Sequence, residues 1–320
     1  MNRPLLKLSV HEIRQESVDV RIFDLRLAGG GDLPPFSAGA HIDIQIDADL
    51  MRQYSLLNHQ EERFRYVIAV KREPAGRGGS IRMHDQVKPG DSLLASIPRN
   101  QFALEEAAIH SVLIAGGIGI TPIWSMAQQL AQLGRSWTLH YASRSRQAAA
   151  LVDALEAFAG AADPTRMSFH FADGTASRLD IRALVDDAPQ GTQFYCCGPA
   201  RLLEAFEAAC AGLPASQVHV ERFSPVQSAA TDGRFTVKLA RSGKMIPVIP
   251  GQTILDALQS VGVDVAYSCR EGVCGQCETS VLAGVPDHRD ALLTDAERAD
   301  GRTMMICCSG SLSDVLTLDL

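Results

Sequence analysis

The residues of this chain that are best suited to chemistry are four of its eight cysteines. Cys269, Cys274 and Cys277 follow a C-x₄-C-x₂-C spacing, and Cys307 comes 30 residues later. Four thiolates in this order are typical of a [2Fe–2S] cluster. Gly272 lies inside the loop, where backbone N–H groups can point at the sulfur atoms. The spacing therefore predicts a one-electron carrier.

A zinc site and a set of buried thiols are the alternative interpretations of these cysteines. Zinc sites usually pair two short C-x₂-C segments, whereas the later cysteines here, Cys307 and Cys308, are adjacent. Neighbouring side chains of an extended segment point opposite ways, so only one of the two should ligate, and we assign Cys307. Because four thiols suffice, we expect His288 to be an exposed loop residue rather than a ligand.

Length and charge narrow the class of protein. A chain of 320 residues should form two or three domains. A net charge of −7 argues against nucleic acid as a partner, and no segment reaches the ~20 apolar residues of a membrane span. The remaining cysteines show no disulfide framework, which favours a reducing, cytoplasmic compartment.

The N-terminal third reads as a small antiparallel barrel. Alternating segments at 18–27, 41–47 and 64–70 are separated by turns rich in Gly and Pro. Two of its features could bind phosphate. Arg52 can grip an anion through two hydrogen bonds, beside Tyr54 and Ser55. The turn residues Gly78, Gly79 and Ser80 precede a short helix at 81–84 and can offer backbone N–H groups.

The middle third alternates strands and helices, which predicts a parallel sheet. Expected strands are 110–115, 136–142, 167–172 and 193–197, and expected helices are 124–133, 148–159 and 200–211. A glycine-rich turn after the first strand can approach a pyrophosphate, with Thr121 as a helix cap. The candidate residues of this turn are Gly116, Gly117, Gly119, Thr121 and Pro122. Cys197 ends the last strand, Gly198 and Pro199 form the turn after it, and Cys196 should point away from Cys197.

The last third follows a polar, breaker-rich linker. A hairpin at 234–240 and 244–248, a helix at 253–261 that begins at a Thr cap, and a strand at 278–282 surround the cysteine loop. The expected domains are 1–105, 106–225 and 233–320, joined by a linker at 226–232.

Together these motifs resemble the phthalate dioxygenase reductase and vanillate O-demethylase reductase family, within the ferredoxin–NADP reductase superfamily. The likeness implies a flavin-binding β-barrel, an α/β nucleotide domain and an α+β, β-grasp, plant-type ferredoxin, in that order. In that family the Arg-x-Tyr-Ser strand and the Gly-Gly-Ser turn bind flavin phosphate, in the form that takes FMN. The likeness further places Val70 and Lys71 beside the flavin ring, Cys197 near the nicotinamide and Phe223 against the flavin.

The choice of nucleotide has two opposing cues. Ser143 and Arg144 follow the second strand, with Arg146 nearby and no acidic residue where ribose would be bound. Arginine there can accept a 2′-phosphate and so indicates NADPH. The resembling reductases prefer NADH, and we expect NADH, with NADPH as the alternative.

The resemblance implies a reductase that passes electrons from NAD(P)H through FMN and the [2Fe–2S] cluster to a separate Rieske-type, non-haem-iron oxygenase. The encounter should be transient, and the chain should be a monomer. Two other functions stay open: an NAD(P)H reductase of a small acceptor such as a quinone, and an iron–sulfur redox sensor. The sensor would leave two further cofactor sites idle.

Overall fold

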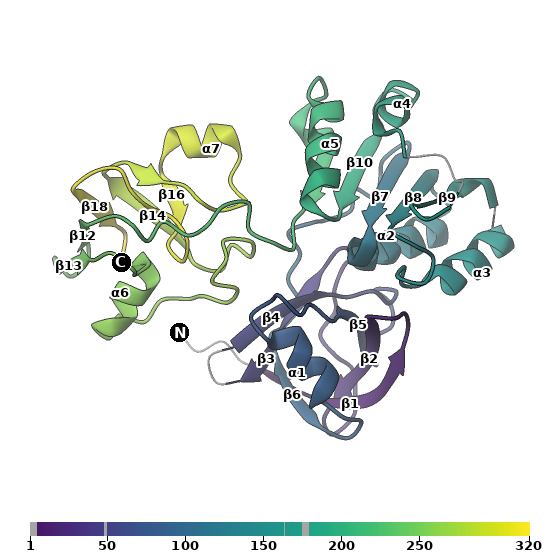
Figure 1. Cartoon of the computed structure of the whole chain (residues 1–320), viewed down its shortest axis with the longest axis horizontal. Helices are drawn as coiled ribbons and strands as arrows, with labels where there is room; N and C mark the ends of the chain where they lie inside the picture. The colour runs from purple at the N-terminus through teal and green to yellow at the C-terminus, as the bar shows by residue number, and fades with distance from the viewer. Residues whose placement is uncertain (1–4, 48–49, 163, 175–178) are drawn as a thin grey trace. The chain divides into compact units, whose positions relative to one another are not determined.

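The computed structural model describes residues 5–47, 50–162, 164–174 and 179–320. These residues form two compact units, one that runs to Glu221 and one that extends from Arg222 to Leu320. The first unit contains the antiparallel barrel and the parallel sheet, and the second contains the cysteine loop (Figure 1). The predicted fold class is thus confirmed. The domain boundaries within the chain stay predictions.

The barrel is a six-stranded antiparallel sheet in the order β4-β3-β6-β1-β2-β5. Its elements are β1 (Leu6–Gln15), β2 (Val20–Leu27), β3 (His41–Asp47), β4 (Leu50–Ser55), β5 (Tyr66–Lys71), α1 (Gly79–Asp85) and β6 (Ser92–Ala95). Alternate residues such as Leu8, Phe23 and Ile42 fill the interior. β4 and β5 stand at the two ends of the strand order, yet they contact each other where the barrel closes. Two edge strands therefore meet there.

The second sheet of this unit is parallel, in the order β11-β10-β7-β8-β9. Its strands are β7 (Ser111–Gly116), β8 (Trp137–Ser143), β9 (Met167–Phe171), β10 (Gln193–Cys197) and β11 (Val218–Glu221). Its helices are α2 (Ile120–Gln132), α3 (Val152–Ala162), α4 (Ile181–Asp186) and α5 (Ala200–Cys210). α2 and α3 pack on one face, and α4 and α5 on the other (Figure 1). Cys197 faces the first pair and Cys196 the second, which confirms their predicted opposition.

Two helices begin elsewhere than predicted. α2 starts at Ile120, and Thr121 does not cap it, because its hydroxyl donates to the carbonyl of Ile118 at 3.0 Å from within the first turn. α3 starts at Val152 rather than at 148. Leu151 has a φ of 64°, in the left-handed region, which is incompatible with a continuous helix through this residue.

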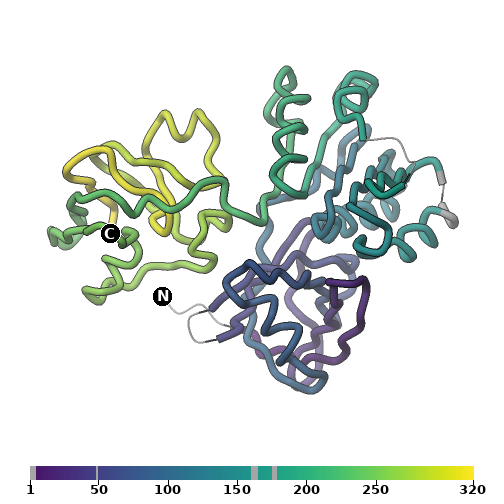
Figure 2. The backbone as a smooth tube through the Cα atoms, in the orientation of Figure 1, coloured from purple at the N-terminus to yellow at the C-terminus, as the bar shows by residue number. Residues whose placement is uncertain are grey.

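The second unit, whose backbone Figure 2 draws in green to yellow, is built on a five-stranded sheet in the order β13-β12-β18-β14-β16. Its elements are β12 (Phe235–Leu239), β13 (Met245–Val248), α6 (Ile254–Ser260), β14 (Glu278–Ala283), β15 (Pro286–Asp287), α7 (Asp295–Asp300), β16 (Thr303–Met305), β17 (Gly310–Ser311) and β18 (Val315–Leu318). α6 buries Ile254, Leu255 and Leu258 against the other core residues, and Thr253 caps it as predicted. This is the predicted α+β ferredoxin fold.

No helix that the structure describes is both long enough and apolar enough to cross a bilayer.

Candidate flavin, nucleotide and iron–sulfur sites

The four cysteines predicted to bind a cluster are brought together by strand pairing in the second unit. β14 begins directly after Cys277, and its first residue, Glu278, pairs with Met305 of β16. The Ile306 N–H then donates to the carbonyl of Cys277, at 3.4 Å, so that Cys307 arrives beside the loop. A residue 30 positions away thus joins the other three.

The thiols interact with one another. A hydrogen bond with Cys269 raises the pKa of Cys274. For Cys307 the bond with Cys269 lowers the pKa, whereas bonds with Cys277 and Cys308 raise it, and the net direction is upward. Among the described residues, no group of three or more His, Cys, Asp or Glu side chains is placed so that it could hold a metal ion. Four thiolates in this spacing are the donor set of a [2Fe–2S] cluster, whereas zinc sites usually pair two short C-x₂-C segments.

The loop backbone turns its N–H groups toward the sulfur atoms, as expected. The Glu271 N–H donates to the Cys269 sulfur at 3.3 Å, and the Gln276 N–H donates to the Cys274 sulfur at 3.5 Å. Arg270 adopts a φ of 59°, which costs free energy for a residue with a side chain. Its guanidinium donates to Asp256 and Gln259 on α6, which holds the loop in this conformation.

Cys308 is hydrogen-bonded to the Cys307 thiol and also makes contacts of its own. Its S–H donates to the carbonyl of Met305, at 3.7 Å. A Cβ at Gly272 would lie 2.5 Å from the Cys308 sulfur, so only glycine fits at that position. The expected exposure of the loop residue His288 is wrong, because its side chain is only 9% exposed. The segment that carries it packs against the cysteine loop, where the Ala291 N–H donates to the carbonyl of Gly272.

The predicted flavin residues lie on the two edge strands of the barrel and on α1. A Cβ at Gly79 would come within 2.7 Å of the Arg52 side chain, so the arginine passes directly over the start of α1. The hydroxyl of Ser80 accepts the Glu73 N–H at 3.0 Å and holds the preceding turn. Arg52 and the Gly78–Ser80 turn therefore share one surface of the barrel.

The hydroxyls of Tyr54 and Ser55 on β4 are buried, and among the described residues neither has a hydrogen-bond partner. Burial also raises the pKa of Tyr54. Buried polar groups usually find partners, so this pair suits a bound polar ligand such as a flavin. On β5, Val70 points into the barrel core, and Lys71 lies near the carboxylates of Asp19 and Glu73.

The two predicted nucleotide motifs touch each other at the carboxyl edge of the parallel sheet. A Cβ at Gly119 would lie 2.2 Å from the carbonyl oxygen of Cys197. A Cβ at Gly116 would lie 2.6 Å from the ring of Pro199, and a Cβ at Gly198 would lie 3.0 Å from the Cα of Gly116. The absence of side chains at these glycines is what allows the two turns to meet.

Tyr141 of β8 is a structural residue that the sequence analysis missed. Its hydroxyl donates to the carbonyl of Gly117, at 3.1 Å, and accepts the Ala150 N–H at 3.0 Å. It thereby ties the glycine-rich turn to the segment after β8, which begins at Arg144, directly after Ser143 at the end of the strand. In the sequence, an aromatic residue on a strand indicates only ordinary core packing, so nothing marked Tyr141 for this role.

The arginine cue for NADPH is weakened by ion pairs. Arg146 donates to Glu156 and to Asp153 on α3. Arg144 is exposed. Acidic side chains thus hold Arg146. Of these two arginines, only Arg144 would be readily available to bind a 2′-phosphate.

Cys197 lies beside a carboxyl group that the sequence analysis did not select. Cys197 is fully buried, and its S–H donates to Oε2 of Glu221 at 4.0 Å across the paired ends of β10 and β11. Burial raises the pKa of Glu221 to about 8. Burial and then this carboxyl group raise the pKa of Cys197 well above its usual value. Both groups therefore hold their protons at neutral pH. The sequence offered one signal for this contact: Glu221 is an acidic residue at the end of β11, the strand that follows the one ending at Cys197.

Phe223 follows Glu221 by two residues and is 40% exposed. Its predicted contact with flavin stays a prediction.

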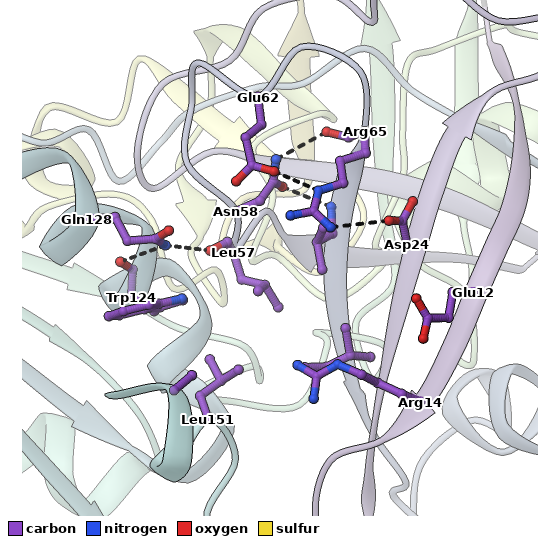
Figure 3. A pocket seen from close by; sticks show the side chains of 13 residues that line it. Glu12, Arg14, Asp24, Leu57, Asn58, Glu62, Arg65, Trp124, Gln128 and Leu151 are labelled. Carbon is purple, nitrogen blue, oxygen red and sulfur yellow. Dashed lines mark hydrogen bonds and ion pairs between the residues drawn. The ribbon is translucent and has the colours of Figure 1, made fainter. Parts of the chain in front are cut away.

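A pocket of about 180 Å³ lies elsewhere in the first unit, between β2, β5 and α2 (Figure 3). Arg65 donates to Glu62 at 2.6 Å and to Asp24 at 3.3 Å, and Gln128 donates to the carbonyl of Leu57 at 2.9 Å. None of the predicted flavin or nucleotide residues lines it. Its polar groups largely bind one another, so we assign it no cofactor.

The raised pKa of Glu221 makes stability depend on pH. The folded state holds this proton up to about pH 8, whereas the unfolded chain loses it near the ordinary value of 4.5. Between these values the folded state binds more protons, so the free energy of unfolding falls as pH rises. Replacing Glu221 by Gln should remove this fall, which is on the order of a few kcal/mol. Denaturant unfolding of the full chain at about pH 5 and about pH 9 measures it.

Glu204→Gln, at an exposed position on α5, is the matched control and should keep the wild-type slope. An identical pH dependence in the wild type and Glu221→Gln would contradict the assignment.

Comparison with known proteins shows three domain families along the chain. The sequence matches the family "Oxidoreductase FAD-binding domain" over residues 7–103 and "Oxidoreductase NAD-binding domain" over 113–208. It matches "2Fe-2S iron-sulfur cluster binding domain" over 237–310. The predicted flavin, nicotinamide and iron–sulfur classes are thereby confirmed.

Relatives match along the whole length. Phenoxybenzoate dioxygenase subunit beta of Ectopseudomonas oleovorans is 56% identical over 315 residues, which cover 98% of this chain and 97% of that protein. Tetrachlorobenzoquinone reductase of Sphingobium chlorophenolicum is 46% identical over 320 residues, with 98% of each covered. The crystal structure of phthalate dioxygenase reductase, described as a modular structure for electron transfer from pyridine nucleotides to [2Fe–2S], is 37% identical. It superposes with a TM-score of 0.76 over 99% of this chain and 98% of that one. This chain therefore belongs to the phthalate dioxygenase reductase family of NAD(P)H-dependent flavin and iron–sulfur oxidoreductases.

Proposed function

We propose that this chain is the reductase component of a two-component, Rieske-type aromatic oxygenase or demethylase. It passes electrons from NADH through FMN and a [2Fe–2S] cluster to the oxygenase. The observation that carries the proposal is the presence of three cofactor sites in one chain, together with full-length similarity to a dioxygenase subunit. A hydride donor, a flavin and a one-electron carrier form a complete electron path.

The bound cofactors supply the redox chemistry, in which flavin converts a two-electron hydride into single electrons. The protein positions them. Arg52 and the turn at Gly78–Ser80 hold the flavin phosphate, and Tyr54 and Ser55 donate toward the flavin. The touching turns at Gly116–Pro122 and Cys197–Pro199 bind the nucleotide. The neutral pair Cys197 and Glu221 keeps charge out of the space where the nicotinamide binds.

A second candidate is reduction of a quinone without a protein partner. The observation that favours it is the 46% identity to tetrachlorobenzoquinone reductase. Both functions use the same three sites and differ only in the final acceptor. Turnover of NADH with a chlorinated benzoquinone, compared with turnover by reconstituted oxygenase, separates them.

The cluster ligands are proposed to be Cys269, Cys274, Cys277 and Cys307. Replacement of any of these by Ser should lower bound iron and acid-labile sulfide and bleach the visible absorption. Cys308→Ser is the matched control and should keep the cluster, since the Cys308 thiol donates to the carbonyl of Met305. Loss of the cluster in Cys308→Ser with retention in Cys307→Ser would reverse the assignment.

The flavin is proposed to be FMN. The short turn at Gly78–Ser80 and the Arg52 side chain above Gly79 form a compact surface for one terminal phosphate. Flavin released with acid should run as FMN in chromatography. Arg52→Ala should lower flavin content more than Arg77→Ala, a matched change in the same turn. Recovery of mainly FAD would refute this proposal.

The nucleotide is proposed to be NADH. Ion pairs with Glu156 and Asp153 hold Arg146, so only one arginine can readily meet a 2′-phosphate. kcat/KM should favour NADH over NADPH by at least tenfold, or about 1.4 kcal/mol. Arg144→Ala should lower kcat/KM for NADPH and leave NADH turnover largely unchanged. A preference for NADPH in the wild type would contradict the proposal.

The encounter with the oxygenase is proposed to be transient and electrostatic. Residues 233–320 carry 8 Lys and Arg against 11 Asp and Glu, so this carrier should be steered toward a basic patch on its acceptor. Small electron-transfer interfaces are weak. In reconstitution with oxygenase, NADH and O₂, product formation should fall as salt increases, while ferricyanide reduction should hold. Salt-independent product formation would exclude an electrostatic encounter.

A further inference from the structure

The segment after β15 packs against the back of the cysteine loop. The Ala291 N–H donates to the carbonyl of Gly272, at 2.9 Å. A Cβ at Gly272 would lie 3.0 Å from the Cα of Asp290. Gly272 lies between Cys269 and Cys274, two of the proposed cluster ligands. Asp290 is therefore in direct contact with the loop that would enclose the cluster.

Asp290 carries its carboxylate into this buried position. The residue is 1% exposed. Its Oδ2 accepts the backbone N–H groups of Leu292, at 3.1 Å, and Leu293, at 2.8 Å. Its Oδ1 lies 3.8 Å from Nδ1 of His288. These contacts fix the orientation of the carboxylate and of the segment that touches Gly272.

Arg298 on α7 holds the same segment without forming a close ion pair with the carboxylate. Its guanidinium donates to the backbone carbonyls of Asp290, at 2.6 Å, and Leu293, at 3.0 Å. Its distance to Oδ2 of Asp290 is 3.8 Å, longer than a charge-assisted hydrogen bond. The negative charge of Asp290 is thus only partly compensated by this cation.

We propose that Asp290 lowers the reduction potential of the cluster and braces the loop that holds it. A [2Fe–2S] cluster with four thiolates is anionic and gains one negative charge on reduction. A buried carboxylate nearby repels that added charge strongly, because the protein interior screens it little. The inference rests on the proposed cluster assignment and adds a residue outside the ligand set.

The two roles are separated by two substitutions in the full-length protein. Asp290→Asn removes the charge but keeps an oxygen that can accept the N–H groups of Leu292 and Leu293. Its cluster should be reduced more readily, with about a tenfold change in the ratio of reduced to oxidised cluster at a fixed potential, or about 59 mV for one electron. A redox titration followed by electron paramagnetic resonance measures this shift.

Asp287→Asn is the matched control. This carboxylate lies in the same segment, but Arg289 binds both of its oxygens, at 2.9 and 2.8 Å, so its charge is compensated. The reduction potential of the cluster in Asp287→Asn should stay at the wild-type value. Asp290→Ala removes both charge and acceptor, so it should lose iron to a chelator faster than the wild type, while Asp290→Asn should lose iron at the wild-type rate.

If Asp290→Asn fails to hold a cluster, Arg298→Gln tests the same electrostatic role through a shift of the reduction potential in the opposite direction. Removal of the cation should make the cluster harder to reduce. A wild-type potential in Asp290→Asn, or a more positive potential in Arg298→Gln, overturns the electrostatic role. Wild-type iron loss in Asp290→Ala overturns the brace. Absence of iron and sulfide from the wild type would refute the cluster assignment, whereas a normal cluster with an unchanged Asp290→Asn potential refutes this inference alone.

Discussion

All three sites depend on one constraint. At certain glycines, neighbouring atoms lie so close to the backbone that no side chain would fit between them. At the nucleotide site a Cβ on Gly119 would lie 2.2 Å from the carbonyl oxygen of Cys197. In the cysteine loop a Cβ on Gly272 would lie 2.5 Å from the Cys308 sulfur. Ordinary van der Waals contact begins well beyond these distances. Each of these close contacts therefore requires glycine at its position.

The strands decide where these contacts fall. In the parallel sheet, β7 and β10 are neighbours, so the turns that follow them emerge side by side at one edge. Ligands of such sheets bind outside the carboxyl ends of the strands. In the second unit, pairing of β14 with β16 carries Cys307 to the other cysteines. In the barrel, the edge strands β4 and β5 meet at its closure and carry the predicted flavin residues. The order of the strands in each sheet thus brings motifs that are far apart in the sequence together into one site.

Electrostatics distinguishes the nucleotide site from the cluster site. Glu221 is half-buried beside the fully buried Cys197, and loss of hydration favours the neutral form of both groups. Asp290 is 1% exposed, its carboxylate accepts two backbone N–H groups, and Arg298 lies 3.8 Å from it. In the first unit a half-buried carboxyl group thus favours its neutral form, whereas in the second unit a buried carboxylate is hydrogen-bonded to the backbone.

The sequence by itself determined the residue types and their local spacing. The spacing of Cys269, Cys274 and Cys277 predicted the loop, the alternation in β3 predicted its bounds, and Thr253 predicted the start of α6. These signals are local, because ligand spacing, strand period and helix caps act within a few residues. Only the tertiary structure decided that Cys197 meets Glu221, that Tyr141 binds the glycine-rich turn, and that His288 and Asp290 are buried behind the cysteine loop. Such contacts join residues far apart in the chain, and they depend on strand order and packing, which no short sequence pattern encodes.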